Sequence, residues 1–347
     1  LASSAASDVY KRQRQSFNHP SIYVWGLHNE VYHPHEYTKE LTRSLHDLAK
    51  TEDPDRYTVS VNGYGHMEHP VNLNADIQGM NRYFGWYEKK LQDIEPWVEG
   101  LEKNYPDQKL MLTEYGADAN IVHQTEYLDN SLNWTKPFYP ETFQTKTHEY
   151  QWSVIAKHPY IIASYLWNMF DFAADARSEG GENGMNHKGL VTFDRQYKKD
   201  AFYTYKAWLS KEPFVHICGK RYVDRTEDLT KVTVYTNQPQ VELFANGKSL
   251  GVQQKGEYPF FYFDVPNSGE TTLTAKAGDC TDESYLRHVD EPNRDYVLQE
   301  EGAVINWFEI ETPPGYMSIN DTIGDILATT RGKLLALRIV QMVRANM

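Results

Sequence analysis

The sequence predicts an α/β region that forms the last part of a (β/α)8 barrel, followed by a β-sandwich. Two observations lead to this fold class. Over residues 14–212, short apolar runs alternate with longer amphipathic runs, a pattern typical of βα units around a parallel sheet. After Pro213, short runs alternate between apolar and polar residues, as the strands of antiparallel sheets do. A chain of 347 residues has room for both regions.

Five apolar runs qualify as strands of the first region. They are residues 21–25, 57–61, 76–83, 109–113 and 161–167. Apolar residues at helical spacing predict the intervening and final helices, around 37–48, 91–101, 142–157 and 200–209. A complete barrel takes about 250 residues, so five units favour the last part of one. A doubly wound open sheet is the alternative, and it is disfavoured because no glycine-rich phosphate loop follows the first strand.

Four short strands with alternating faces are expected in the second region, at 231–235, 240–245, 260–265 and 270–277. Asn246-Gly247, which directly follows the run at 240–245, is a strong hairpin-turn signal. The sandwich is therefore expected over 213–290, and the remainder, 291–347, reads as a loop followed by a terminal helix. The loop includes Pro313-Pro314-Gly315, and the helix is expected from Ile323 to Leu335.

The beginning of the chain is expected to lie outside the fold. Residues 1–13 lack an initial Met and the apolar stretch of a signal peptide, so we interpret them as a non-native or disordered leader. A predicted buried strand follows almost at once, which leads us to expect a missing N-terminal part. Localisation therefore stays open between the cytoplasm and the periplasm or exterior, with the cytoplasm ranked first.

Composition excludes several classes of partner. The net charge of −13 argues against nucleic acid, which needs a basic surface. No apolar run approaches the roughly 18 residues of a membrane span. Cys218 and Cys280 are the only cysteines, too few for a disulfide framework or a thiolate metal site, and the histidines form no convincing metal triad. The sequence therefore predicts neither a metal nor a cofactor.

Two glutamates follow apolar runs at the predicted carboxyl edge of the sheet. Glu30 ends SIYVWGLHNE and Glu114 ends KLMLTE. Active sites of parallel βα folds lie at this edge. Helix capping or a structural ion pair would explain either residue alone, but two carboxylates at one edge favour glycoside hydrolysis. A separation of about 5–5.5 Å would indicate retention of anomeric configuration, and one of about 6.5–9.5 Å inversion.

Four segments, in order, resemble glycoside hydrolase family 2, which includes β-galactosidases and β-glucuronidases. NHPSIYVWGLHNE (18–30) resembles the acid/base signature of the family, and LTEYGAD (112–118) its nucleophile segment. MNRYFGWY (80–87) resembles the active-site strand between them, and residues 167–208 resemble the last strand, loop and helix. VELFANGKSLG (241–251) resembles the immunoglobulin-like module that follows the barrel in many family members.

The resemblance implies a role for each matching residue. Glu30 matches the general acid/base and Glu114 the nucleophile, with Asn29 as the partner of the sugar 2-hydroxyl. Tyr83 matches the tyrosine that contacts the nucleophile, and Trp167 matches an aromatic wall of the sugar site, although plain core packing would also explain it. Asn81 lies at the same strand end as Tyr83 and is also expected in the substrate site.

Asn186 and Lys188 bear on the identity of the sugar. An Asn-x-Lys pair can clamp a sugar carboxylate, as in β-glucuronidases. Related β-galactosidases carry a similar segment, and we rank a galactoside above a glucuronide. Family resemblance alone allows Mg²⁺ beside the acid, with further ligands outside this chain.

The sequence as a whole predicts a retaining exo-β-glycosidase that hydrolyses terminal β-galactosides, with a β-glucuronidase as the alternative. Because the resemblance starts inside the barrel, we expect the chain to be a C-terminal fragment that is inactive alone. An alternative of another class is a non-catalytic carbohydrate-binding or interaction fragment. The expected partner is a carbohydrate substrate, and a full-length parent could form a homo-oligomer.

Overall fold

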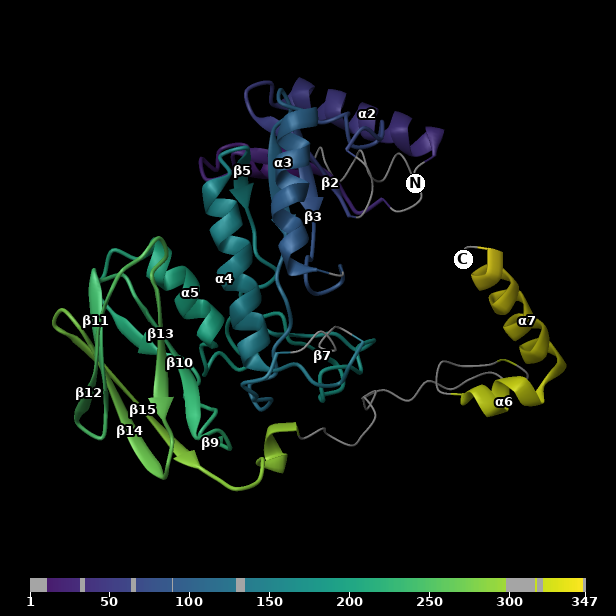
Figure 1. Cartoon of the computed structure of the whole chain (residues 1–347). Helices are drawn as coiled ribbons and strands as arrows, with labels where there is room; N and C mark the ends of the chain where they lie inside the picture. Colours follow the sequence, from purple (N-terminus) through teal and green to yellow (C-terminus); the bar gives the residue numbers. More distant parts are fainter. Residues whose placement is uncertain are drawn as a thin grey trace. The chain divides into compact units, whose positions relative to one another are not determined.

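A computed structural model describes residues 11–31, 35–63, 67–88, 90–128, 135–297, 316 and 321–345. The chain divides into two compact units, Leu1–Gly302 and Ala303–Met347. Within its described residues, the first unit contains a parallel sheet with its helices, two larger further sheets and a two-stranded ribbon (Figure 1).

Five parallel strands form one sheet in the order in which they occur along the chain. They are β1 (Val24–Asn29), β2 (Tyr57–Asn62), β3 (Ile77–Asn81), β4 (Leu110–Glu114) and β5 (Ile161–Ser164). A doubly wound sheet would reverse its strand order at a switch point. The consecutive order β1-β2-β3-β4-β5 is instead that of successive units of a (β/α)8 barrel.

Four helices accompany the sheet at the predicted places. They are α2 (Glu36–Glu52), α3 (Ile94–Asn104), α4 (Glu141–Lys157) and α5 (Asp200–Leu209), with a 3₁₀ turn at Leu91–Asp93 before α3. Leu110 and Leu112 of β4 pack in one buried cluster with Val98 of α3 and Val154 of α4. Met111 lies between these two leucines and belongs to a separate cluster on the other face, because side chains alternate along a strand.

The first strand begins later than the sequence predicts. We expect it at residues 21–25, whereas β1 runs from Val24 to Asn29. Parallel pairing with β2 matches Val24 with Tyr57 and Asn29 with Val61. The hydrogen-bond ladder to the neighbouring strand therefore sets the ends of β1, and hydropathy alone misses its polar final residues.

Two antiparallel-rich sheets enclose a second core. One has the order β13-β10-β8 and the other β12-β11-β14-β15-β9. Their strands are β8 (Val215–Ile217), β9 (Asp224–Arg225), β10 (Leu229–Thr236), β11 (Gln240–Ala245), β12 (Lys248–Gln254), β13 (Phe260–Pro266), β14 (Glu270–Ala277) and β15 (Cys280–His288). Val234 and Phe261 of one sheet share a cluster with Leu243 and Leu273 of the other, so the two sheets form a sandwich.

The predicted hairpin turn joins β11 to β12. Asn246 and Gly247 both have positive φ, 50° and 77°, as a type I′ turn requires. The four strands predicted for this region correspond to β10, β11, β13 and β14. The sequence does not predict β8, β9, β12 and β15. β8 and β9 span only three and two residues, and the solvent-facing positions of β12 and β15 carry many polar residues.

The chain ends differ from a simple leader and a single terminal helix. Residues 11–16 are helical, and Gln13 is buried with its amide donating to the Ala49 carbonyl at 2.9 Å. In the second unit, the expected terminal helix is two helices, α6 (Ile323–Ala328) and α7 (Thr330–Ala345). The Pro313-Pro314-Gly315 loop lies outside the described residues.

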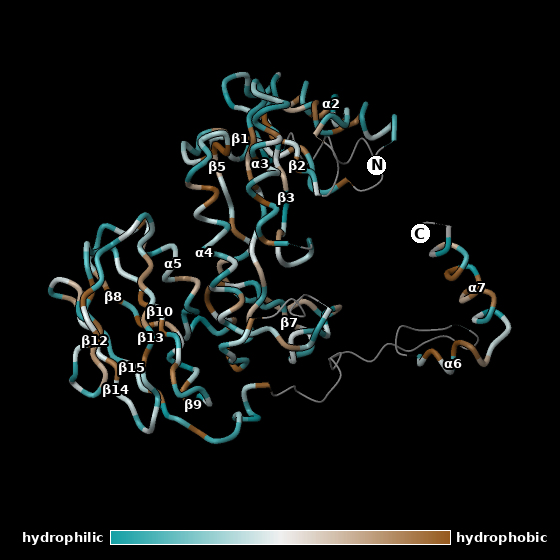
Figure 2. The backbone as a smooth tube through the Cα atoms, in the orientation of Figure 1, coloured by the Kyte–Doolittle hydropathy of each residue, from teal (hydrophilic) through white to brown (hydrophobic). Residues whose placement is uncertain are grey.

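Hydropathy along the chain agrees with this arrangement. Figure 2 shows apolar positions within the strands of the sandwich and along α6 and α7. None of the helices among the described residues combines the length and the apolar character needed to cross a bilayer.

Candidate active site

A cavity of about 520 Å³ opens at the carboxyl end of the parallel sheet. Its lining residues are Asn29, Glu30, Tyr83, Tyr87, Glu114, Trp167, Phe172, Ala174, Arg177, Asn186 and Lys188. Seven of the eight predicted site residues are among them. The eighth, Asn81, is buried and bonds to two of the lining residues.

Glu30 directly follows β1, and its backbone is in the left-handed region, with φ at 52°. That conformation costs a non-glycine residue roughly 1–2 kcal/mol. The Glu30 amide donates to the Val61 carbonyl at 2.9 Å, which holds the residue against the end of β2. The local strain therefore accompanies a fixed placement of the Glu30 carboxylate at the cavity wall.

Asn81 at the end of β3 forms hydrogen bonds with residues at the ends of both β1 and β4. Its Nδ2 donates to Oε1 of Glu30 at 2.9 Å and to Oδ1 of Asn29 at 3.1 Å. Its Oδ1 accepts the Thr113 hydroxyl at 2.7 Å, and Thr113 immediately precedes Glu114. The Asn81 side chain is 1% exposed, so these bonds are shielded from water.

Glu114 ends β4 and lines the same cavity as Glu30. Burial raises the pKa of Glu114 above its ordinary value, and the charge of Glu30 adds to this rise. The hydroxyl of Tyr83 donates to Oε2 of Glu114 at 2.6 Å, and this bond lowers the pKa of Glu114 and so opposes the rise. Burial and the Glu114 charge raise the pKa of Tyr83 itself, so the phenol stays protonated and remains a donor.

Lys188 also lines the cavity and is held by two contacts. Its ammonium lies 2.6 Å from Oδ2 of Asp118 and 2.7 Å from the Tyr87 hydroxyl. The Lys188 amide donates to Oδ1 of Asn186 at 3.0 Å, which fixes the Asn186 side chain beside it. Lys188 is only 1% exposed, so Asp118 supplies the counter-charge that its burial requires.

Four contributors to the cavity, Arg177, Asp118, Tyr87 and Phe172, are not among the site residues predicted from the sequence. Arg177 donates to the Tyr87 hydroxyl at 2.9 Å, so two cations meet at one phenol oxygen. Asp118 and Tyr87 stand within the segments that resemble the family, which was the available signal for them. Phe172 contacts Trp167 edge-to-face, with ring centroids 5.9 Å apart. Trp167 is 37% exposed, so core packing alone does not account for it.

A short ribbon supports the segment that carries Asn186 and Lys188. β6 (Phe172–Ala173) pairs with β7 (Met185–Asn186). A side chain at Gly189 would meet the Asp171 amide at 2.0 Å, so only glycine allows this close approach. Behind it, the buried Lys199 ammonium bonds to Asp171 at 2.8 Å and to the His187 carbonyl at 2.9 Å.

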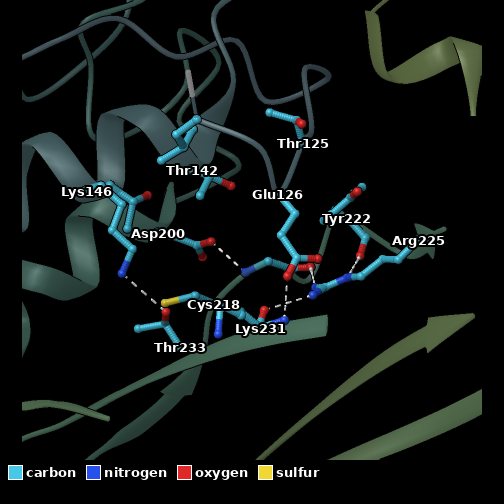
Figure 3. Close-up of a pocket in the computed structure, with 13 residues that line it drawn as sticks. Thr125, Glu126, Thr142, Lys146, Asp200, Cys218, Tyr222, Arg225, Lys231 and Thr233 are labelled. Carbon is cyan, nitrogen blue, oxygen red and sulfur yellow. Dashed lines mark hydrogen bonds between the residues drawn. The ribbon is translucent and has the colours of Figure 1, made fainter. Parts of the chain in front are cut away.

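Two groups among the described residues bring three potential metal ligands together: Asp200, His216 and Cys218, and Glu95, Glu99 and His158. Figure 3 shows Asp200 and Cys218 lining a separate cavity of about 130 Å³. Asp200 is already bonded to His216 at 2.8 Å and to the Gly219 amide. Neither group includes Glu30.

Family comparison agrees with this geometry. A model described as "Glycosyl hydrolases family 2, TIM barrel domain" matches residues 2–211, and a domain of unknown function matches 227–279. The first match covers more than half of the chain. The chain therefore belongs to glycoside hydrolase family 2, and its parallel sheet belongs to a TIM barrel domain.

Three relatives are informative. A Bacteroides fragilis β-glucuronidase is 39% identical over 248 residues, which are 71% of this chain and 35% of the relative. A crystal structure described as a "putative beta-galactosidase" from Bacteroides fragilis is 62% identical, with a TM-score of 0.81 over 85% of this chain and 45% of that one. An FMN-binding β-glucuronidase from Faecalibacterium prausnitzii is 35% identical, with the same TM-score and coverage. The chain thus spans between a third and a half of these proteins.

Proposed function

We propose that this chain carries the catalytic pair of a retaining exo-β-glycosidase. Glu114 acts as the nucleophile and Glu30 as the general acid/base. The observation that carries the proposal is that both carboxylates line one cavity at the end of the parallel sheet, with Asn81 donating to Glu30 and Tyr83 donating to Glu114. We expect their oxygens to be about 5–5.5 Å apart, the spacing of retaining enzymes.

The reaction uses the two carboxylates in sequence. Glu114 attacks the anomeric carbon and forms a glycosyl ester while Glu30 protonates the departing oxygen. Glu30 then removes a proton from water, which attacks the ester and releases the sugar with its configuration retained. The Tyr83 hydroxyl binds one oxygen of Glu114, and the other oxygen is the one we assign to attack.

For the sugar, we rank a terminal β-glucuronide first. Lys188 and Arg177 both line the cavity and both donate to Tyr87, and two neighbouring cations suit the C6 carboxylate of a glucuronide. Two of the three relatives described above are named β-glucuronidases. A β-galactoside, which the sequence ranked first, is the second candidate, and the 62% identical structure supports it.

The sandwich region is proposed to be an immunoglobulin-like domain. Under this proposal, residues 14–212 form the partial barrel and 213–290 the sandwich. The leader predicted at 1–13 is not retained, because Gln13 is buried and bonded to Ala49. Residues 291–297 belong to the first unit and not to a separate C-terminal segment. The shared core of the two sheets supports an independent sandwich.

A non-catalytic carbohydrate-binding fragment is the proposal that competes with the glycosidase, and a turnover assay decides between these two.

The test is a substrate comparison. Because β1 and β5 form open edges of the five-stranded sheet among the described residues, we expect no turnover from the chain alone. We therefore also assay a completed enzyme, which we define as this chain joined to the remaining part of the 62% identical protein. The proposal predicts turnover of nitrophenyl β-glucuronide, with a kcat/KM that falls at least about tenfold in Lys188→Met while any β-galactoside activity is retained.

The outcomes separate the candidates. Preferential turnover of nitrophenyl β-galactoside, unaffected by Lys188→Met, would support the galactosidase. A well-folded completed enzyme without activity on either substrate would favour the non-catalytic fragment.

A further inference from the structure

A second open cavity, of about 340 Å³, lies beside the catalytic one and shares no lining residue with it. Met185 and His187 line the second cavity, whereas Asn186 and Lys188 line the first. Successive side chains of an extended segment point to opposite sides, so this segment forms a common wall between the two cavities.

His187 gives the second cavity a polar group that needs a partner. Its ring is almost fully buried, with 4% of the residue exposed. Nε2 has no hydrogen-bond partner among the described residues, and Oε2 of Glu182 lies 3.6 Å away, beyond hydrogen-bond distance. Burial lowers the pKa of His187 well below its ordinary value, so the ring is neutral. Nε2 is closed to solvent in this structure, so a ligand hydroxyl reaches it only when the ring moves toward the cavity; that bond would then remove the cost of leaving the nitrogen unpaired.

Two carboxylates in the wall are held by one oxygen each. Gly189 and Lys199 both donate to Oδ1 of Asp171. The hydroxyl of Thr192 and the amide of Gln196 both donate to Oδ1 of Asp194. In both cases the side chain is anchored in a fixed orientation, and Oδ2 is the acceptor that we assign to a ligand. Carboxylate acceptors favour hydroxyl donors and repel anions.

Aromatic rings complete the second cavity. Phe193 and Tyr197 both line it, and they are 52% and 50% exposed. Exposed rings beside fixed hydrogen-bond acceptors suit a molecule with an apolar face and a polar rim. The C–H face and the hydroxyl rim of a pyranose have this character.

We propose that this cavity is an accessory binding site for a neutral sugar unit, distinct from the catalytic cavity. The sugar ring packs on Tyr197, and its hydroxyls bond to His187, Asp171 and Asp194. The carboxylates select against a uronic acid at this site. The proposal does not depend on which sugar the catalytic cavity cleaves.

The experiment titrates methyl β-D-galactopyranoside and methyl β-D-glucopyranoside into the full chain and, in parallel, into the completed enzyme, using saturation-transfer NMR. We expect a Kd of about 1–10 mM for at least one of them. Asp194→Asn and Tyr197→Ala should each weaken binding about tenfold or more. Tyr57→Ala is the matched control, because Tyr57 is also 50% exposed but lies on β2, and it should not change the affinity.

A Trp167→Ala variant separates the two cavities, because Trp167 lines only the catalytic one. Binding that persists in Trp167→Ala and disappears in Asp194→Asn, with an unchanged melting temperature, supports the accessory site. Three results would overturn it. The first is no saturable binding at about 50 mM sugar. The second is loss of all binding in Trp167→Ala while Asp194→Asn binds as the unchanged protein does, and the third is binding of methyl β-D-glucuronide to Trp167→Ala as tight as that of the neutral sugars.

Discussion

The hydroxyl of Tyr83 donates to Oε2 of Glu114 across 2.6 Å, from the segment after β3 to the last residue of β4. The bond stabilises the carboxylate form of Glu114, whereas burial and the charge of Glu30 favour the protonated form. The ionisation of the proposed nucleophile therefore depends in part on this phenol, which acts together with the charge of Lys188 and a hydrogen bond from Asn81.

Removing that phenol should change the pH dependence of turnover. In Tyr83→Phe the pKa of Glu114 rises further, because the bond that lowers it is lost. Since the nucleophile must be ionised, the acid limb of the kcat/KM profile of the completed enzyme should move to higher pH. We expect kcat to fall by about 10²-fold as well. An acid limb at the same pH as in the unchanged enzyme would contradict this role of Tyr83.

The raised pKa of Glu114 also predicts a pH-dependent stability change. The folded state binds the Glu114 proton more tightly than the unfolded chain does, so ionisation destabilises the fold as pH rises through the raised pKa. Glu114→Gln removes this ionisation. The gain in free energy of unfolding should therefore be larger at about pH 8 than at about pH 4. Urea unfolding of the completed enzyme measures it, and a gain that shrinks as pH rises would be inconsistent with the shift.

Glu30→Ala should separate the two halves of the reaction. Protonation of the leaving oxygen matters for poor leaving groups, so alkyl glycosides should lose far more activity than nitrophenyl glycosides. Azide, which needs no base, should partly restore turnover of the nitrophenyl substrate. Glu30→Gln serves as the control that keeps the side-chain volume. Equal losses on both substrate types would assign the acid to another residue.

The buried Lys199–Asp171 pair should be costly to break on one side. Lys199 is fully buried, and its ammonium bonds to Oδ1 of Asp171 at 2.8 Å. Lys199→Met leaves an unpaired buried carboxylate, with an expected loss of about 3–5 kcal/mol in the free energy of unfolding. Adding Asp171→Asn should recover part of this, because an amide keeps an acceptor for Gly189 without the charge.

Lys198→Met is the matched control for that loss. Lys198 is adjacent and exposed, so its replacement should change stability by less than about 0.5 kcal/mol. Similar losses from the two lysines, measured by urea unfolding, would contradict the importance assigned to the pair.

The sequence predicts which edge of the sheet carries Glu30 and Glu114, because the order of apolar runs and polar residues shows where each strand leads. Both glutamates lie shortly after an apolar run, and parallel strands bring their carboxyl ends to one edge. The prediction of β1 is less accurate, since a hydrogen-bond ladder with β2 determines where it begins and ends.

Other parts of the site depend on contacts that hydropathy does not encode. Arg177 and Tyr87 are 90 residues apart along the chain, yet they are hydrogen-bonded at the cavity wall. Asp118 and Lys188 form their ion pair over a separation of 70 residues. Spacing rules describe neighbours along one element, so only the folded chain brings these residues together.

The central claim is that Glu114 forms the covalent intermediate. A 2-deoxy-2-fluoro glycoside with a good leaving group slows breakdown of that intermediate and allows it to accumulate. We predict that the completed enzyme, treated with such a glucuronide or galactoside, gains the mass of one fluorosugar and that peptide mapping locates it on Glu114. A label on Glu30 or on any other carboxylate, or a label that persists in Glu114→Gln, would contradict the account.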